Sequence, residues 1–89
     1  SDGQVPAPPA RQLWACNEGE TVKVARISDK DPEMLRYFSS VGISLDSRVR
    51  VETRREFAGM ISIAIESADG AETIVDLGSP AARAVWVVP

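Results

Sequence analysis

Hydrophobic and polar residues alternate along several short stretches of the chain, a spacing that is typical of half-buried β-strands. In the first stretch, Val22 and Val24 share one face. The alternation fails at Arg26–Ile27, where we expect the strand to bulge or end. The whole pattern predicts five strands, at residues 21–27, 47–56, 60–67, 73–77 and 85–88.

Between the first two predicted strands, the apolar spacing changes from two residues to three and four, which predicts a helix at about residues 31–41. Asp31 is suited to cap its first turn, Pro32 to occupy its first position, and Gly42 to end it. A shorter helical turn is expected near residues 79–83. Five short strands with one inserted helix predict a small, mainly β, partly open barrel, because closing the sheet protects its edges.

The first twelve residues have a different composition, with three prolines at positions 6, 8 and 9. Proline favours the extended polyproline-II conformation, so residues 1–12 are interpreted as a linker. The segment is either a semi-rigid spacer or a proline-rich ligand for an aromatic groove. The folded domain is then expected at residues 13–89.

The composition excludes several classes of function. The chain has 89 residues, which is enough for one domain, and a net charge of −3, which argues against direct nucleic-acid binding. It has no histidine and one cysteine, Cys16, so it cannot form a catalytic Ser-His-Asp or Cys-His system or a Cys/His zinc site. No apolar run approaches the ~20 residues that span a bilayer. We therefore expect a cytoplasmic protein that is not an enzyme and does not bind a membrane.

The run NEGETVKVARI, followed by LRYFSSVGISLDSRVRV, ISIAI and TIVDLGSPAARAVWV, resembles the SH3-like barrel of ferrous-iron-transport protein A (FeoA). The same barrel forms the C-terminal domain of metal-dependent repressors of the diphtheria-toxin-repressor family. At the turn before the second strand, the family usually has Pro-Gly or Val-Gly, whereas this chain has Leu45 followed by Asp46, and aspartate tolerates positive φ. The likeness covers about residues 13–88, and its main positions are Gly19, Phe38, Gly42, Ile43, Val49, Val51, Ala82 or Ala84, Val85 and Val87.

The resemblance implies a function as well as a five-stranded SH3-like fold. Because a proline-rich tether precedes this barrel in the repressors, we expect the chain to be the C-terminal regulatory domain of an iron- or manganese-dependent transcriptional repressor. Its partners would be the repressor's own N-terminal DNA-binding and dimerisation domains and the tether, with DNA bound only by the homodimeric parent protein. The alternative is a free-standing FeoA-type accessory protein of a ferrous-iron transporter. A general peptide-binding SH3 module is disfavoured, since few aromatic residues are present to line a groove.

The acidic start of the predicted helix is the first candidate site. In the repressors that the chain resembles, the barrel lends a carboxylate and an amide, three residues apart, to an ancillary metal site shared with another domain. The matching positions are Asp31 and Met34, with Glu33 substituting if the alignment shifts by one residue. A carboxylate suits Mn²⁺ or Fe²⁺, whereas a thioether is a poor ligand for them. Asp31 either contributes to such a site or only caps the helix.

Arginines and tryptophans supply two further candidates. Strict alternation would place Arg48, Arg50 and Arg54 on one outward face, either solvated or serving as a docking surface for acidic groups of another domain. Trp14 and Trp86 either pack at the ends of the barrel or form the walls of a groove that receives the proline-rich tether.

Overall fold

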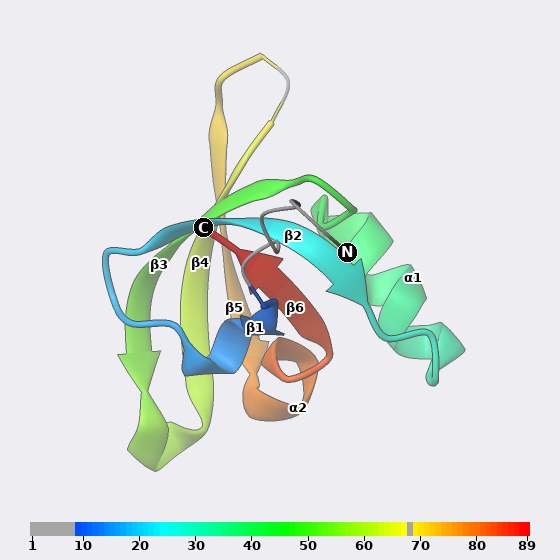
Figure 1. The fold of residues 1–89 in the computed structure, drawn as a ribbon, viewed down its shortest axis with the longest axis horizontal. Helices are drawn as coiled ribbons and strands as arrows, with labels where there is room; N and C mark the ends of the chain where they lie inside the picture. The colour runs from blue at the N-terminus through cyan, green and yellow to red at the C-terminus, as the bar shows by residue number, and fades with distance from the viewer. Residues whose placement is uncertain (1–8, 68) are drawn as a thin grey trace, which may run out of the picture.

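The computed structural model describes residues 9–67 and 69–89, which form one mainly antiparallel β structure with two short α-helices (Figure 1). In chain order the elements are β1 (Arg11–Gln12), the 3-10 turn η1 (Leu13–Ala15), β2 (Thr21–Ile27), α1 (Pro32–Val41), β3 (Arg48–Arg55), the 3-10 turn η2 (Glu56–Ala58), β4 (Met60–Glu66), β5 (Glu72–Gly78), α2 (Ser79–Ala82) and β6 (Val85–Val88). The predicted fold class is confirmed, and the five predicted strands correspond to β2, β3, β4, β5 and β6.

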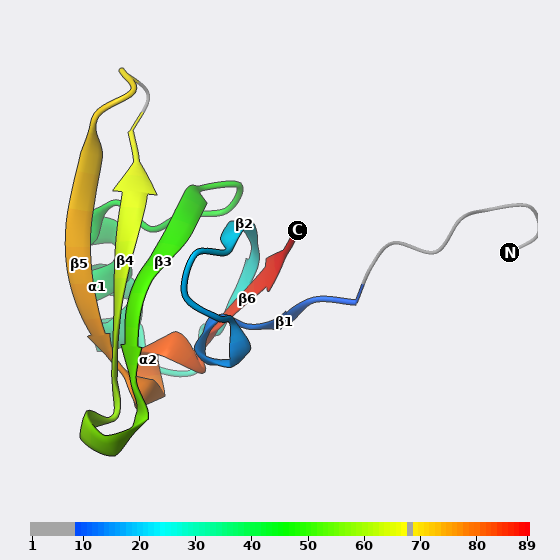
Figure 2. The ribbon, with the colours of Figure 1, turned by 90° about the vertical axis from the view of Figure 1, so that its left-hand side faces the viewer.

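The six strands of the described residues form one bent sheet in the order β1-β6-β2-β3-β4-β5. In Figure 2, β3, β4 and β5 stand as one layer, with β2 and β6 on the other side of the core. The ends of the sheet do not pair with each other, so β1 and β5 are its two edges. The barrel is therefore open, as the sequence predicts.

The alternating residues of the strands point into a shared core. Leu13, Val24, Phe38, Ile63 and Val87 are each at most 1% exposed. Phe38 is the buried residue of α1, and it joins the valines and isoleucines of the strands in one cluster. The core thus confirms the period-two pattern of the strands and the helical spacing of α1.

The junction between α1 and β3 has the backbone geometry that its sequence indicates. Gly42 adopts a left-handed conformation with φ 91°, and the Ile43 N–H donates to the Phe38 carbonyl at 2.9 Å, which ends the helix. Ile43 is 3% exposed and fixes the crossing to the core. Asp46 has φ 70°, so it adopts the positive φ that aspartate tolerates.

Two register shifts interrupt the sheet. The first lies between Val24 and Arg26 of β2, where the sequence predicts a bulge. The second lies between Val51 and Thr53 of β3 and was not predicted, because the side-chain pattern alternates through it. This second bulge decides where the arginines of β3 point.

The first strand of the sheet lies within the segment that we assigned to the linker. Arg11 pairs with Val87, and Gln12 pairs with Trp86, as a two-residue antiparallel ladder. Pro6 and Pro8 lie outside the described residues, and Pro9 is exposed without regular structure. A linker over residues 1–12 followed by a domain over 13–89 stays a prediction, with the sheet beginning at Arg11.

Candidate functional site

The carboxylate of Asp31 caps helix α1. Its Oδ1 accepts the backbone N–H of Glu33 at 3.0 Å and that of Met34 at 3.4 Å, and Pro32 occupies the first helical turn. The Glu33 side chain is exposed, whereas Met34 is half-buried and packs against the core. The prediction that Asp31 caps the helix is therefore confirmed, and the Met34 side chain packs against the hydrophobic core.

The three candidate metal ligands do not make a complete metal centre. Among residues 9–67 and 69–89, no group of three or more His, Cys, Asp or Glu side chains is placed to hold a metal ion. The Met34 thioether is a poor ligand for a hard divalent cation. Asp31 and Glu33 could supply carboxylate oxygens only if the remaining ligands came from outside the described residues.

Arg50 lies on the outer face of the sheet and is held by two carboxylates. Its guanidinium donates to both oxygens of Glu72, at 2.9 and 3.0 Å, and to Glu52 at 2.6 Å. These charge-assisted bonds, the Glu72 pair first, raise the pKa of Arg50. Arg50 is therefore already paired within the chain.

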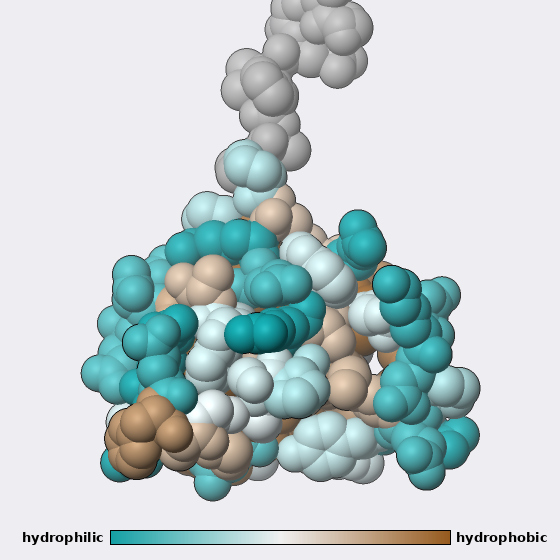
Figure 3. All heavy atoms as spheres, turned by 90° about the horizontal axis from the view of Figure 1, so that it is seen from below, coloured by the Kyte–Doolittle hydropathy of each residue, from teal (hydrophilic) through white to brown (hydrophobic). Residues whose placement is uncertain are grey.

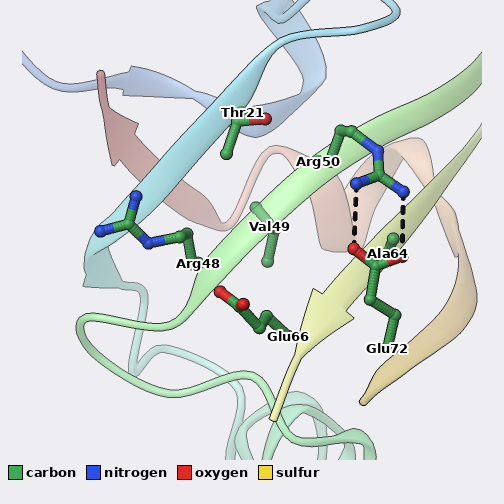
Figure 4. Close-up of a pocket in the computed structure, with 7 residues that line it drawn as sticks. All are labelled: Thr21, Arg48, Val49, Arg50, Ala64, Glu66 and Glu72. Atoms are coloured by element: carbon green, nitrogen blue, oxygen red, sulfur yellow. Dashed lines mark hydrogen bonds and ion pairs between the residues drawn. The ribbon is translucent and has the colours of Figure 1, made fainter. Parts of the chain in front are cut away.

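Arg48 belongs to the same outer face, and its guanidinium points away from that of Arg50 (Figure 4). Between them lies a depression of about 210 Å³ with polar and apolar walls. Its lining residues come from β2, β3, β4 and β5: Thr21, Arg48, Val49, Arg50, Ala64, Glu66 and Glu72. Both signs of charge surround this depression, so it is not a purely basic surface.

Arg54 does not share the face of Arg48 and Arg50. After the bulge it pairs with Ile61, which is 1% exposed, so Arg54 lies on the core side of the sheet. Its Nε donates to the Trp14 carbonyl at 2.9 Å, and its guanidinium carbon lies 5.0 Å from the centre of the Trp14 ring. The expected three-arginine face is corrected to two arginines, because the extra bulge residue shifts the alternation.

Trp14 and Trp86 are each stacked by a different arginine. Arg54 covers the ring of Trp14, and the Arg26 guanidinium carbon lies 4.6 Å from the centre of the Trp86 ring. Both tryptophans are half-buried, and neither lines the depression beside Arg50. The structure thus shows packing and cation–π contacts for both rings, while a groove for the tether stays a prediction.

The beginning of the domain is held by charged groups that the sequence did not single out. Glu20 pairs with Arg11, and its Oε2 also accepts the Asn17 N–H at 2.6 Å. The bond from Arg11, followed by that from Asn17, lowers the pKa of Glu20. Cys16 is buried beside them, and burial raises the pKa of its thiol. The molecular face seen in Figure 3 shows hydrophilic residues with smaller hydrophobic areas between them.

Over the described residues the chain forms an open, antiparallel sheet with two short α-helices, which places it in the class of small SH3-like β domains. Residues 11–89 match the FeoA domain family, so the chain belongs to that family. None of the helices in the described residues has the length and apolar character to cross a membrane. A search among curated proteins found no match.

Two similar solved structures are manganese-dependent repressors. One, described as a manganese-dependent transcriptional repressor in complex with manganese, is 74% identical, has a TM-score of 0.85, and is matched over 99% of this chain and 40% of its own. A second manganese-dependent transcriptional repressor is 72% identical, has a TM-score of 0.84, and is matched over 99% of this chain and 46% of its own. This chain thus spans less than half the length of either repressor.

A third structure supports the fold alone. The iron uptake regulatory protein FeoA is 19% identical, with a TM-score of 0.74 over 89% of this chain and 96% of its own. At this identity the likeness concerns the course of the backbone and not the chemistry.

Proposed function

We propose that this chain is the C-terminal regulatory domain of a manganese-dependent transcriptional repressor, and that it modulates metal-activated DNA binding by docking against the repressor's other domains. The observation that carries the proposal is the 74% identity to a manganese-dependent repressor over 99% of this chain. We expect no enzymatic activity. The parent protein is expected to be a cytoplasmic homodimer.

The proposed regulation is a difference in docking free energy between two states of the parent. A domain that docks more tightly in the metal-bound state favours that state, and metal binding favours docking to the same extent. DNA contact is assigned to the other domains, because this chain has a net charge of −3. The outer face around Arg48, where the neighbouring Arg50 is already paired, is the docking surface that the sequence suggested.

The metal would be bound largely by groups outside this chain. When bound, manganese would act as a charge that joins ligands from two domains. Asp31 or Glu33 would each contribute a carboxylate oxygen, the ligand type that Mn²⁺ prefers. The capping bonds use only Oδ1 of Asp31, so the second carboxylate oxygen makes no hydrogen bond within the described residues.

Deletion of residues 13–89 from the full-length protein tests the regulatory role. DNA binding is measured by fluorescence anisotropy while Mn²⁺ is titrated into the intact and the truncated protein. The proposal expects the truncated protein to bind DNA with a shifted manganese midpoint. An identical midpoint and an identical DNA affinity in both proteins would contradict it.

Asp31→Ser in the full-length protein tests the metal ligand separately. Serine still caps a helix, so this variant removes the carboxylate and keeps the first turn of α1. If Asp31 is a ligand, the manganese midpoint rises, while Asp29→Ser, which changes a neighbouring acidic residue outside the cap, leaves it unchanged. Equal midpoints for both variants would assign Asp31 to capping alone.

The alternative, a free-standing accessory protein of a ferrous-iron transporter, is favoured by one observation. The FeoA structure is matched over 96% of its own length, which means that this fold occurs without added domains. The natural reading frame separates the two functions. An upstream winged helix-turn-helix domain supports the repressor, and its absence supports the accessory protein.

A further inference from the structure

Within the part of the chain that the structure describes, strand β5 is an edge strand, and one side of its backbone has no neighbouring strand. The Asp76 carbonyl accepts the Tyr37 hydroxyl at 3.4 Å, so it points away from β4. In an antiparallel strand, the backbone N–H and C=O groups of every second residue point away from the neighbouring strand. The backbone groups of Ile74 and Glu72 therefore also point away from β4. The Ser67 N–H donates to the Ala71 carbonyl at 2.8 Å, which fits the same alternation. The backbone groups of Glu72 and Ile74 are thus available to another strand, whereas the Asp76 carbonyl already accepts from Tyr37 of α1.

The side chains of this edge give it an apolar centre and acidic flanks. Ile74 is 58% exposed, although it lies in the middle of the strand. Glu72 and Asp76 lie two positions to either side, on the same outer face, and both are exposed. An exposed isoleucine between unpaired backbone groups is the arrangement that invites strand addition.

The surrounding charge is negative. No lysine or arginine occurs between Arg55 and Arg83 in the sequence, whereas the β4–β5 hairpin carries Glu66, Asp69, Glu72 and Asp76. Arg50 of β3 neutralises Glu72 by pairing with it, whereas Glu66, Asp69 and Asp76 make no ion pair within the described residues, so the hairpin stays acidic overall. A partner with basic side chains would therefore complement this edge.

We propose that the Glu72–Asp76 edge of β5 binds an extended segment of another polypeptide that carries basic side chains on both sides of an apolar one. The segment would join the sheet as an additional strand, with backbone hydrogen bonds to Glu72 and Ile74. Its apolar residue would lie opposite Ile74, and its basic residues opposite Glu72 and Asp76. This inference goes beyond the proposed repressor function and does not depend on manganese.

A second copy of the chain fits this edge poorly. Antiparallel self-pairing centred on Ile74 would place Glu72 of one copy opposite Asp76 of the other. Like charges directly opposite each other destabilise a sheet. The acidic flanks thus select a basic segment and disfavour association of two copies.

The probe is a synthetic peptide, acetyl-Lys-Thr-Val-Thr-Lys-amide, titrated into the ¹⁵N-labelled 89-residue chain. We expect the peptide to shift the amide signals of Glu72 and Ile74 and to slow hydrogen exchange at the Ile74 amide. Both effects should disappear at high salt. The matched peptide with glutamate in place of both lysines should produce no shifts at the same concentration.

Ile74→Pro is the main test variant. Because the Ile74 N–H points away from β4, proline removes a donor of the free edge and leaves the β4–β5 ladder intact. We expect the affinity for the peptide to fall at least ~10-fold, because one backbone hydrogen bond and one apolar contact are lost. The control is Phe57→Lys. Phe57 is another exposed apolar residue, 91% exposed, and it lies in η2, before the end of β4 that is far from the β4–β5 hairpin. This variant should bind the peptide as the original chain does.

A double variant keeps the test independent of how Ile74→Pro folds. Glu72→Lys combined with Asp76→Lys should bind the glutamate peptide and no longer the lysine peptide. The proposal is overturned if Ile74→Pro folds and binds normally, if the double variant keeps its preference for lysine, or if shifts appear away from β5. Dimerisation of the unmodified chain through β5 would overturn it as well.

Discussion

Arg50 and Arg54 belong to the same strand, yet the structure gives them different surroundings. Arg50 lies before the β3 bulge, on the outer face, and its side chain is 41% exposed between Glu52 and Glu72. Arg54 lies after the bulge, and its side chain is 23% exposed. It covers the Trp14 ring and donates to the Trp14 carbonyl.

The difference shows how one additional residue changes the role of a side chain. When two exposed charges pair, each gives up contacts with water, and solvent and salt screen the attraction between them. The net contribution of such a pair to folding stability is therefore small. A half-buried arginine on an indole adds a cation–π contact, packing of its stem and a bond to a carbonyl. The comparison therefore predicts that Arg54 contributes substantially to the free energy of unfolding and that Arg50 contributes little.

Replacing Arg54 with alanine should have the largest effect on stability. We expect the free energy of unfolding to fall by about 2 kcal/mol, from one cation–π contact and one hydrogen bond to the backbone. The Arg54 N–H still donates to Glu18, so the strand itself is preserved. Urea unfolding followed by tryptophan fluorescence measures the change.

Arg50→Ala is the matched control for that measurement. It removes an arginine of the same strand, and the urea midpoint should hardly move. If Arg50→Ala destabilises the protein as much as Arg54→Ala does, the bulge does not separate their roles. If Arg54→Ala leaves the midpoint unchanged, the Trp14 contact is not stabilising.

The strands and α1 could be predicted because their signals are local. The alternation of Val22 and Val24, and the Asp31–Pro32 cap with Gly42 at the other end, need no knowledge of the rest of the fold. Strand β1 could not be predicted in this way. Arg11–Gln12 has no periodicity of its own and becomes a strand only by pairing with β6.

The candidate sites were harder to predict because they depend on partners that are distant in the sequence. The β3 bulge is defined by its register with β4, so the alternation of arginines on β3 gave the wrong face for Arg54. The pairing of Arg50 with Glu72 connects β3 with the edge strand β5, and no local spacing predicts it. The cap at Asp31 was predictable, since cap and helix are adjacent.

The reactivity of the Cys16 thiol reports on the structure around Trp14 and Arg54. Its side chain is fully buried just after η1, and burial raises the pKa of its thiol above the ordinary value. The folded chain should therefore react with a thiol reagent at least ~100-fold more slowly than the denatured chain, even near pH 9.

The Arg54→Ala variant should increase that reactivity by about tenfold, because Trp14 in η1 loses its contact, while Arg50→Ala should not. Reaction with a chromogenic disulfide under native conditions gives both rates. The raised thiol pKa also means that this group favours the folded state below its unfolded pKa and that the contribution is lost as the pH rises above it. Equal thiol reactivity in both variants would show that Arg54 does not hold η1.

A double-mutant cycle isolates the contact between Arg54 and Trp14. The single variants Arg54→Ala and Trp14→Leu and their combination should give a coupling energy of about 1 kcal/mol. Leucine keeps an apolar side chain at position 14 and removes the indole face. A coupling near zero would assign the effect of Arg54→Ala to its hydrogen bond to the Trp14 carbonyl, which the leucine variant retains.

The corresponding cycle for Arg50 and Glu72 should give the smallest effect. Arg50→Gln, Glu72→Gln and their combination remove one or both charges and keep side chains of similar length. We expect a small favourable coupling at low ionic strength that disappears at about 1 M NaCl, where the Debye length is ~3 Å. The Arg54–Trp14 coupling should persist in the same salt, since the indole and the packed stem exclude ions. Similar salt sensitivity for the two pairs would mean that the two sides of the β3 bulge do not differ in solvation, contrary to the burial of Arg54.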